Sequence, residues 1–226
     1  MSMAAKPTIG DLSDAVQDYL REIYKLQLEH GQVKTSTLAL RRRVAPPSAT
    51  AMMKKLASLG LVEHQLYYGV RLTRSGERIA LELLRHHRLL ELYLARTLDL
   101  GIDAVHAEAD RLEHALSEAL EEHIDKALGS PTQDPHGDPI PDPKLRIVHS
   151  KSKPLTELRS GEEATVERIP DGDGELLRYL VALALVPGTR VQLIRAEPLG
   201  GPLILGTNGR ETVISRQLGD QIRVSI

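Results

Sequence analysis

The stretch His106-Ala-Glu-Ala-Asp110-Arg-Leu-Glu113-His114 contains, besides Glu108, two imidazoles and two carboxylates, those of His106, Asp110, Glu113 and His114. It lies in a run from Ile102 to Leu128 that has no Pro or Gly and is rich in Ala, Leu and Glu, which predicts one long helix. On that helix these four side chains share an arc of roughly 100°. The apolar side chains, expected to face the core, centre roughly 110° away and are Val105, Ala109, Leu112, Leu116 and Leu120. Such a face offers nitrogen and oxygen ligands for a metal, although a solvated charged face has the same pattern.

A second expected helix, from Gly76 to Leu98, carries the same residue types. Its His87 and Glu91 are spaced i, i+4 and therefore share a face. Two neighbouring helices that both present His and Glu favour a metal site over chance. His86 is one residue out of step with this face, so we expect it on the surface or behind a ligand.

The residues before these helices predict a small DNA-binding domain. Helices are expected over 12–30, 35–42 and 46–59, and the alternating run 61–73 predicts a β-hairpin with its turn near Tyr68-Gly69. This is a winged helix-turn-helix pattern, whose third helix enters the major groove. The expected phosphate or base contacts are Arg41, Ser48, Thr50, Lys54, Lys55 and Arg71. The alternative is a basic surface on a small helical domain that does not bind DNA.

The rest of the chain changes character. Residues 129–143 hold five of the thirteen prolines, which predicts a linker or a structured turn. Short strand-like runs follow at 163–169, 190–196, 203–206, 211–215 and 221–226, with a short helix or turn at 175–184. Short strands at this spacing predict a small β-barrel of SH3-like type, without the basic surface or aromatic platform that binds nucleic acid.

Composition excludes several classes of protein. The chain has 226 residues, a net charge of −2 and no Cys, so a disulfide scaffold, a thiolate zinc site and a cysteine nucleophile are ruled out. DNA binding by a chain of this charge must come from a local basic patch. No secretion signal and no apolar run of membrane-spanning length is present, so we expect a cytoplasmic protein without a membrane partner.

Three stretches together resemble the diphtheria toxin repressor family, the metal-dependent transcriptional regulators of iron and manganese uptake. They are His87-Arg-Leu-Leu-Glu91, the run from Val105 to His114, and Pro131-Thr-Gln-Asp-Pro-His-Gly-Asp-Pro-Ile-Pro141. The resemblance implies an α+β multidomain protein. A winged helix-turn-helix domain would cover 1–73, a helical metal-binding and dimerisation domain 74–143, and an SH3-like, FeoA-type domain 150–226.

The resemblance also implies two metal sites per chain. The primary site would use Asp18 with Asp110, Glu113 and His114. The ancillary site would use His87, Glu91 and His106, and Asp173 or Glu175 are the candidates for a further ligand from the SH3-like domain. Pro47, Ser48, Thr50 and Ala51 occupy the stretch with which the family reads DNA.

The chain departs from both branches of the family. The iron-responsive branch has Cys where this chain has Asp110 and Met where it has Asp18. The manganese branch has carboxylates at both positions but also an acid where this chain has Arg21. A site of oxygen and imidazole ligands suits Mn²⁺, with Fe²⁺ as the alternative, because it lacks a soft ligand.

We therefore expect a homodimeric, metal-dependent repressor that binds a palindromic operator in double-stranded DNA and is not an enzyme. One alternative is a helical-bundle metalloenzyme, a hydrolase or an oxidase, which the paired His and carboxylate helices permit. The other is a DNA-binding protein that needs no metal.

Overall fold

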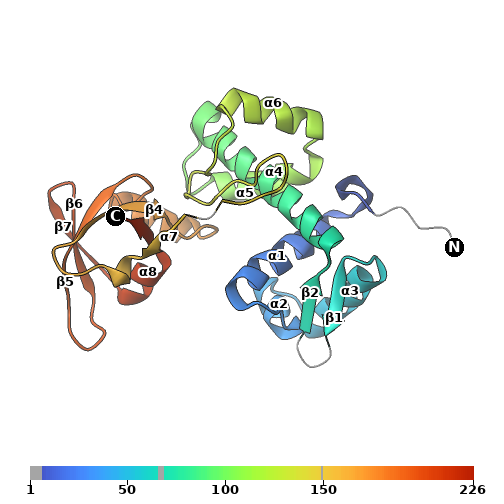
Figure 1. Cartoon of the computed structure of the whole chain (residues 1–226), viewed down its shortest axis with the longest axis horizontal. Helices are drawn as coiled ribbons and strands as arrows, with labels where there is room; N and C mark the ends of the chain where they lie inside the picture. The colour runs from blue at the N-terminus through green and yellow to red at the C-terminus, as the bar shows by residue number, and fades with distance from the viewer. Residues whose placement is uncertain (1–6, 66–68, 149) are drawn as a thin grey trace. The chain divides into compact units, whose positions relative to one another are not determined.

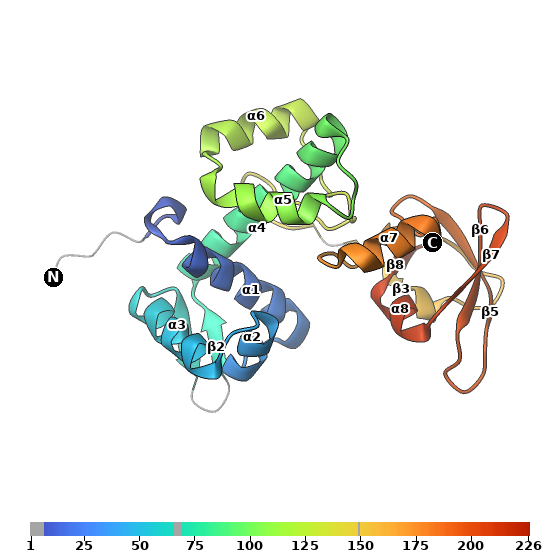
Figure 2. The same cartoon turned by 180° about the vertical axis from the view of Figure 1, so that it is seen from behind.

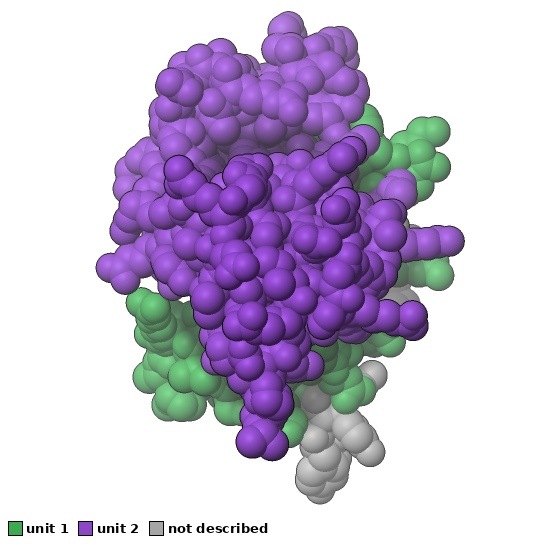
Figure 3. All heavy atoms as spheres, turned by 90° about the vertical axis from the view of Figure 1, so that its left-hand side faces the viewer, with its two compact units in different colours: residues 1–86, 141–146 green, residues 87–140, 147–226 purple. Residues whose placement is uncertain are grey.

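A computed structural model describes residues 7–65, 69–148 and 150–226 of the chain. The chain divides into two compact units, which Figure 3 shows in different colours. One consists of residues 1–86 and 141–146, and the other of residues 87–140 and 147–226. Each unit is described by itself.

The first unit is a helix-turn-helix with a wing. Its elements are η1 (Ile9–Asp11), α1 (Asp14–His30), α2 (Thr35–Arg41), α3 (Pro46–Ser58), β1 (Val62–Gln65), β2 (Gly69–Leu72) and the first part of α4 (Arg74–Leu98). Strands β1 and β2 pair antiparallel, from Val62 opposite Leu72 to Gln65 opposite Gly69. The expected turn falls largely on residues 66–68, outside the described residues. Figure 1 shows α1, α2 and α3 gathered beside this hairpin.

Amphipathic spacing explains how these helices pack. On α1, Val16, Leu20 and Ile23 are all buried, and Gly31 ends the helix with a φ of 75° that a side chain rarely adopts. On α3 a Pro occupies the first turn, where no helical N–H is lost, and the buried side chains are Ala49, Met53 and Leu56. The predicted helices therefore form, each within two residues of its expected bounds.

A close contact fixes the start of α4 against the hairpin. A Cβ added to Gly76 would lie 2.0 Å from the carbonyl oxygen of Leu61, so only glycine fits there. His86, also on α4, is buried, so the expectation of a surface position was wrong, whereas a position behind a ligand stays untested.

The helical part of the second unit differs from the prediction. The single helix expected from Ile102 to Leu128 was wrong: α5 (Val105–Leu112), η2 (Glu113–Ala115) and α6 (Glu118–Leu128) take its place. Leu116 is extended, and the Ser117 side chain accepts a hydrogen bond from the Leu120 backbone N–H at 3.3 Å. Ser is a strong N-cap, and acids in the first turn favour a helix start there. The break lies directly after the stretch from His106 to His114, so α6 is a separate helix and does not continue α5.

These helices share an apolar core with α4 and the proline-rich segment. The core residues are Leu89, Leu90, Leu92, Ala109, Ile124 and Ile140. The segment is a structured turn, in which Gln133 pairs with Pro139 and the Ile140 N–H donates to the Thr132 carbonyl at 2.9 Å.

The C-terminal part of the second unit is a six-stranded antiparallel sheet with helices beside it (Figure 2). Its elements are β3 (Lys153–Pro154), η3 (Leu155–Glu157), β4 (Glu163–Arg168), α7 (Gly174–Ala182), β5 (Arg190–Ala196), β6 (Leu203–Thr207), β7 (Arg210–Ile214), α8 (Arg216–Gln221) and β8 (Arg223–Ser225). The strand order is β3-β8-β4-β5-β6-β7, and one apolar core joins the sheet to α7 and α8.

The five predicted strands are present, and the structure adds a helix that the sequence did not predict. Helix α8 was not predicted, although Ser215 caps it by accepting a hydrogen bond from the Leu218 N–H. Among the described residues the sheet is open, with β3 and β7 as its edges, so a closed barrel is not shown. The part of the chain that the structure describes has no helix both long and apolar enough to span a bilayer.

Candidate metal centre and DNA-binding face

The exposed face of α3 carries the residues predicted to read DNA. Pro47, Ser48, Thr50, Ala51, Lys54 and Lys55 are all exposed, and the buried residues lie on the opposite side of the helix. A helix that buries one side and leaves hydroxyl and ammonium groups on the other can enter a groove without unfolding.

Two arginines predicted for this face differ in their surroundings. Arg71, on β2, is exposed. Arg41, at the end of α2, is exposed but paired with Glu29 at 2.7 Å and with Glu22 at 3.1 Å. A phosphate at Arg41 would have to compete with these two carboxylates.

His87 is the centre of a cluster of side chains from α4, α5 and η2. Its Nε2 lies 3.0 Å from Glu91 Oε1 and 3.1 Å from His106 Nδ1. Its Nδ1 lies 2.7 Å from Glu113 Oε2 and 3.4 Å from Asp110 Oδ1. We call His87, Glu91, His106, Asp110 and Glu113 the His87 cluster. It brings together residues predicted for both metal sites, because they belong to adjoining helices.

The environment of Glu91 is suited to a metal ligand. Its Oε1 also lies 2.9 Å from His106 Nδ1. Burial would raise the pKa of Glu91, but the neighbouring His87, His106 and His136 outweigh it and hold that pKa well below its usual range. The carboxylate is therefore ionised, as metal binding requires.

The predicted primary ligands belong to different units of the chain. Glu113 is 1% exposed, and its Oε1 lies 3.6 Å from Nε2 of the half-buried His114, so this end of the stretch is not a solvated face. Asp18 belongs to the first unit, where its carboxylate accepts a hydrogen bond from Arg42 at 2.8 Å. Asp110, Glu113 and His114 belong to the second unit.

A further set of possible ligands was missed from the sequence. Glu91, Asp134 and His136 are all buried, and one ligand atom of each lies within 4.8 Å of the others. His136 Nδ1 is buried and makes no hydrogen bond, and it lies 3.7 Å from Glu91 Oε2. We call Glu91, Asp134 and His136 the His136 set. Glu91 belongs to both groups and turns a different oxygen towards each.

Each new member is oriented by the backbone. His136 Nε2 lies 3.2 Å from the Ile102 carbonyl, a contact of the kind that orients histidine ligands. Asp134 Oδ1 accepts hydrogen bonds from the N–H groups of His136 and Asp138, both at 2.9 Å. These contacts leave His136 Nδ1 and Asp134 Oδ2 for a further partner, and Arg88 Nε lies 3.6 Å from that Oδ2.

The surroundings of Asp134 and His136 raise the pKa of both side chains. Burial, followed by the Glu91 and Asp138 carboxylates, raises the pKa of Asp134 to about 8. Burial would lower the pKa of His136, but Glu91 and then Asp134 outweigh it and raise that pKa to about 9. Burial and neighbouring carboxylates thus favour positive charge at this place, a setting that suits a divalent ion.

The two candidates from the C-terminal sheet stand outside these groups. Asp173 is exposed and caps α7, accepting from the N–H groups of Glu175 at 3.0 Å and Leu176 at 3.2 Å, and Glu175 is exposed. The chain nevertheless comes close to the metal ligands here, because a Cβ on Gly172 would lie 3.7 Å from His106 Nε2.

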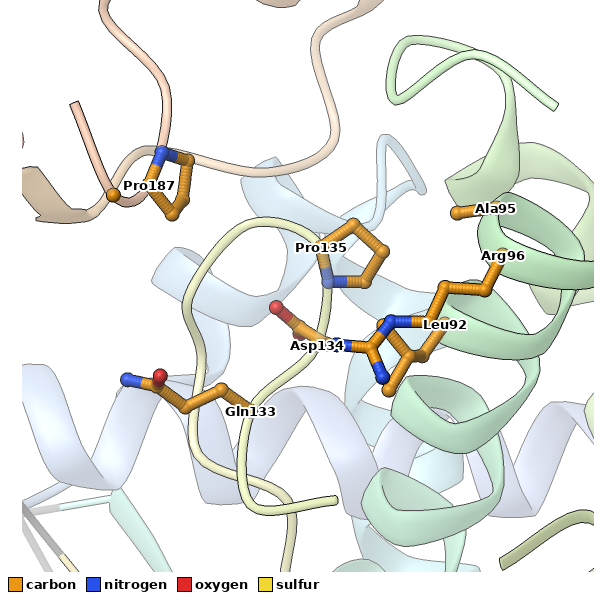
Figure 4. A pocket seen from close by; sticks show the side chains of 8 residues that line it. Leu92, Ala95, Arg96, Gln133, Asp134, Pro135 and Pro187 are labelled. Carbon is orange, nitrogen blue, oxygen red and sulfur yellow. The ribbon is translucent and has the colours of Figure 1, made fainter. Parts of the chain in front are cut away.

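A pocket of about 440 Å³ opens beside Asp134 (Figure 4). Leu92, Ala95 and Arg96 of α4, the loop residues Gln133, Asp134 and Pro135, and Pro187 with Gly188 line it. The pocket therefore places one member of the buried His136 set next to open space.

Comparisons with known proteins agree along the chain. Residues 11–70 match the family model "Iron dependent repressor, N-terminal DNA binding domain", and residues 73–142 match "Iron dependent repressor, metal binding and dimerisation domain". Residues 153–226 match the FeoA domain.

Individual relatives extend this match. A solved structure described as a manganese-dependent transcriptional repressor in complex with manganese is 36% identical, with a TM-score of 0.85 over 92% of this chain and 98% of that one. The regulator MntR of Lysinibacillus sphaericus is 31% identical over 46% of this chain and 73% of its own length. The iron-dependent repressor IdeR of Mycobacterium leprae is 30% identical over 96% of this chain and 99% of its own. With DNA-binding, dimerisation and FeoA segments matched in that order and a relative aligned from end to end, the chain belongs to the iron-dependent repressor family of metal-dependent, DNA-binding transcriptional regulators.

Proposed function

We propose that this chain is a homodimeric repressor of metal-uptake genes that binds its operator when Mn²⁺, or alternatively Fe²⁺, is bound. The observation that carries the proposal is the His87 cluster, where imidazoles and carboxylates from three elements converge and His87, Glu91 and Glu113 are buried. Burying so many ionisable groups is costly unless each has a partner of opposite charge. A divalent cation supplies that charge, and oxygen and imidazole ligands without a thiolate suit Mn²⁺ or Fe²⁺.

The primary site would link the DNA-binding unit to the metal-binding unit. Asp18 comes from α1 of the first unit, and Asp110, Glu113 and His114 come from the second. An ion that accepted ligands from both would hold the DNA-reading helix at one position, which raises affinity for an operator of fixed half-site spacing. Because Arg42 donates a hydrogen bond to Asp18 at 2.8 Å, an ion at this site would compete with that guanidinium.

The ancillary site would use more of the chain than the resemblance implies. His87 and His106 lie next to Oε1 of Glu91, and His136 lies next to its Oε2, with Asp134 in the same group. We propose that the second ion is bound by Glu91 together with Asp134 and His136, with the nearby histidines of the His87 cluster. Asp173 or Glu175 is our candidate for a further ligand, and Asp173 would then serve both the ion and the start of α7.

Exposed leucines support a dimer contact in the helical part. Leu98, Leu112 and Leu120 are 54%, 45% and 52% exposed, although the sequence pattern predicts Leu112 and Leu120 to be buried. A second copy of the chain would cover them. A dimer places two reading helices on a palindromic operator, since protein two-fold symmetry is mirrored in the DNA.

The domain limits 1–73, 74–143 and 150–226 remain our proposal, as do an SH3-like closure of the last domain and a cytoplasmic location. The predicted regulatory role requires no catalytic activity of the chain. The C-terminal domain would act on metal binding and not on DNA directly.

The deciding experiment measures DNA affinity against metal. Fluorescence anisotropy with a duplex from the chain's own upstream region is compared in EDTA, Mn²⁺ and anaerobic Fe²⁺. We expect tight binding only with metal, and its loss in Glu113→Gln. The matched control is His123→Ala, because His123 is an exposed histidine of α6 outside both groups. Equal affinity in EDTA and Mn²⁺ would favour a metal-independent DNA-binding protein.

A further inference from the structure

The loop that carries Asp134 and His136 is held from two sides. On one side Arg88 of α4 donates to the Pro139 carbonyl and lies 3.2 Å from Asp138 Oδ1. On the other side the loop lies against β4 of the C-terminal sheet, in the same unit. The same Asp138 oxygen accepts a hydrogen bond from Arg168 at 3.3 Å. One carboxylate therefore joins α4, the loop and the sheet.

Main-chain contacts reinforce this joint at the histidine itself. The Ile169 N–H donates to the His136 carbonyl at 3.0 Å. The next residue, Gly137, has a φ of 87°, and a Cβ added to it would lie 1.8 Å from the Glu167 carbonyl oxygen. Strand β4 therefore packs so closely against the backbone beside His136 that position 137 has no room for a side chain.

From these contacts we propose that Gly137 and Arg168 are positioning residues for the metal site that includes His136, and that docking of the C-terminal sheet sets the affinity of this site. The inference rests on the proposed function, because it assumes that the His136 set binds metal. Neither positioning residue offers a metal ligand in this arrangement. They act through the loop, by fixing where the His136 ring and the Asp134 carboxylate lie.

The physical reason is the rigidity of the ligand set. His136 Nδ1 and Glu91 Oε2 are 3.7 Å apart, a separation compatible with two ligands of one ion. If the loop moved freely before the ion bound, metal binding would have to order it. The entropy lost in that ordering would lower the affinity for metal. Removing such supporting contacts around a metal typically lowers affinity roughly 10- to 100-fold. Binding is reciprocal, so the ion should also strengthen docking of the sheet.

The test uses the full chain with His114→Ala, which removes a predicted primary ligand and leaves the His136 set intact. Mn²⁺ binding is followed by electron paramagnetic resonance of the free ion. His136→Phe should abolish the remaining binding. Gly137→Ala should weaken it roughly 10-fold or more. The matched control is Gly129→Ala, because Gly129 has a similar φ of 77° but nothing within 4 Å of the added Cβ.

A milder pair of variants guards against misfolding. Arg168→Ala should weaken binding in the same direction, and Arg168→Lys should restore part of it. Arg195→Ala should not change it, since Arg195 is an exposed arginine that pairs with Glu197 at 2.8 Å. Proteolytic release of the C-terminal part should be slowed by Mn²⁺ in the parent and less in Arg168→Ala. If His136→Phe abolishes binding while Gly137→Ala and Arg168→Ala bind like the parent, the positioning role is refuted and the metal site stands. If His136→Phe has no effect, the metal site itself is refuted, and the positioning role with it.

Discussion

Replacing His136 by Phe should remove a pH dependence of folding stability from the metal-free chain. In that chain His136 is protonated at neutral pH. Burial would lower its pKa, but Glu91 and Asp134 outweigh burial and raise that pKa to about 9. The ordinary value is 6.5, and each unit of difference corresponds to about 1.4 kcal/mol. The protonated histidine therefore stabilises the folded chain by about 3 kcal/mol at pH 6.

The direction of the pH effect follows from the folded chain's stronger hold on the proton. A pKa raised on folding gives a stabilisation that is complete below the unfolded value of about 6.5 and is lost as the pH rises through about 9. Asp134 acts in the same direction over a lower window, because its pKa is raised from 3.8 to about 8. Its stabilisation is complete below about pH 4 and is largely lost by about pH 8. His136→Phe removes the histidine effect and leaves the Asp134 effect, on which His136 is the last of the causes.

The assay is urea denaturation in EDTA at pH 6 and pH 9.5, followed by circular dichroism. The parent should lose about 3 kcal/mol more than His136→Phe between these two values. His123→Phe, which replaces an exposed histidine, should behave like the parent. If the parent and His136→Phe show the same pH dependence, the contact of His136 with Glu91 carries no charge and the argument is refuted.

Three other substitutions test separate parts of the reasoning. Lys55→Ala should weaken binding to all DNA sequences and lower the slope of log affinity against log salt by about one, because an exposed ammonium on α3 would contact phosphate; an unchanged slope would place another surface on the DNA. Asp110→Cys should move metal activation from Mn²⁺ towards Fe²⁺, Co²⁺ or Zn²⁺ in an anaerobic DNA-binding titration, since a thiolate is a softer ligand, and an unchanged order of metals would count against a ligand role for Asp110. Gly76→Ala should lower the free energy of unfolding, measured in urea, by about 1–3 kcal/mol, because the added Cβ would lie 2.0 Å from the Leu61 carbonyl oxygen. Gly→Ala usually stabilises a helix, so a stabilised variant would show that α4 can shift.

Helical periodicity predicted correctly which residues share a face when they lie on the same helix. His87 and Glu91 are four residues apart on α4 and do share a face, and the exposed side of α3 follows from its buried Met53 and Leu56. The break in the predicted helix from Ile102 to Leu128 was missed for a local reason. Ala, Leu and Glu favour a helix along the whole run. A single Ser such as Ser117 is not enough to predict that one helix ends and another begins there.

The break also changes why the ligands meet. His106 and Asp110 share a face of α5, but Glu113 reaches His87 because η2 turns the chain there. An arc measured on a straight helix could not account for this contact. The sequence therefore predicts the members of the His87 cluster better than the geometry that unites them.

The His136 set could not be found by periodicity, because Asp134 and His136 lie in a loop far from Glu91 in sequence. A signal was present, because a His between Pro135 and Gly137, with an Asp two residues away on each side, is an unusual choice for a mere linker. Its meaning depends on charge. Glu91, Glu113 and Asp134 are all buried near His87 and His136, with Arg88 as a neighbouring cation. A fold selected for stability alone would gain by replacing such a group with apolar side chains. Its retention is explained if a divalent ion balances the carboxylates, and the chain then needs the loop, the sheet behind it and α4 to keep them together.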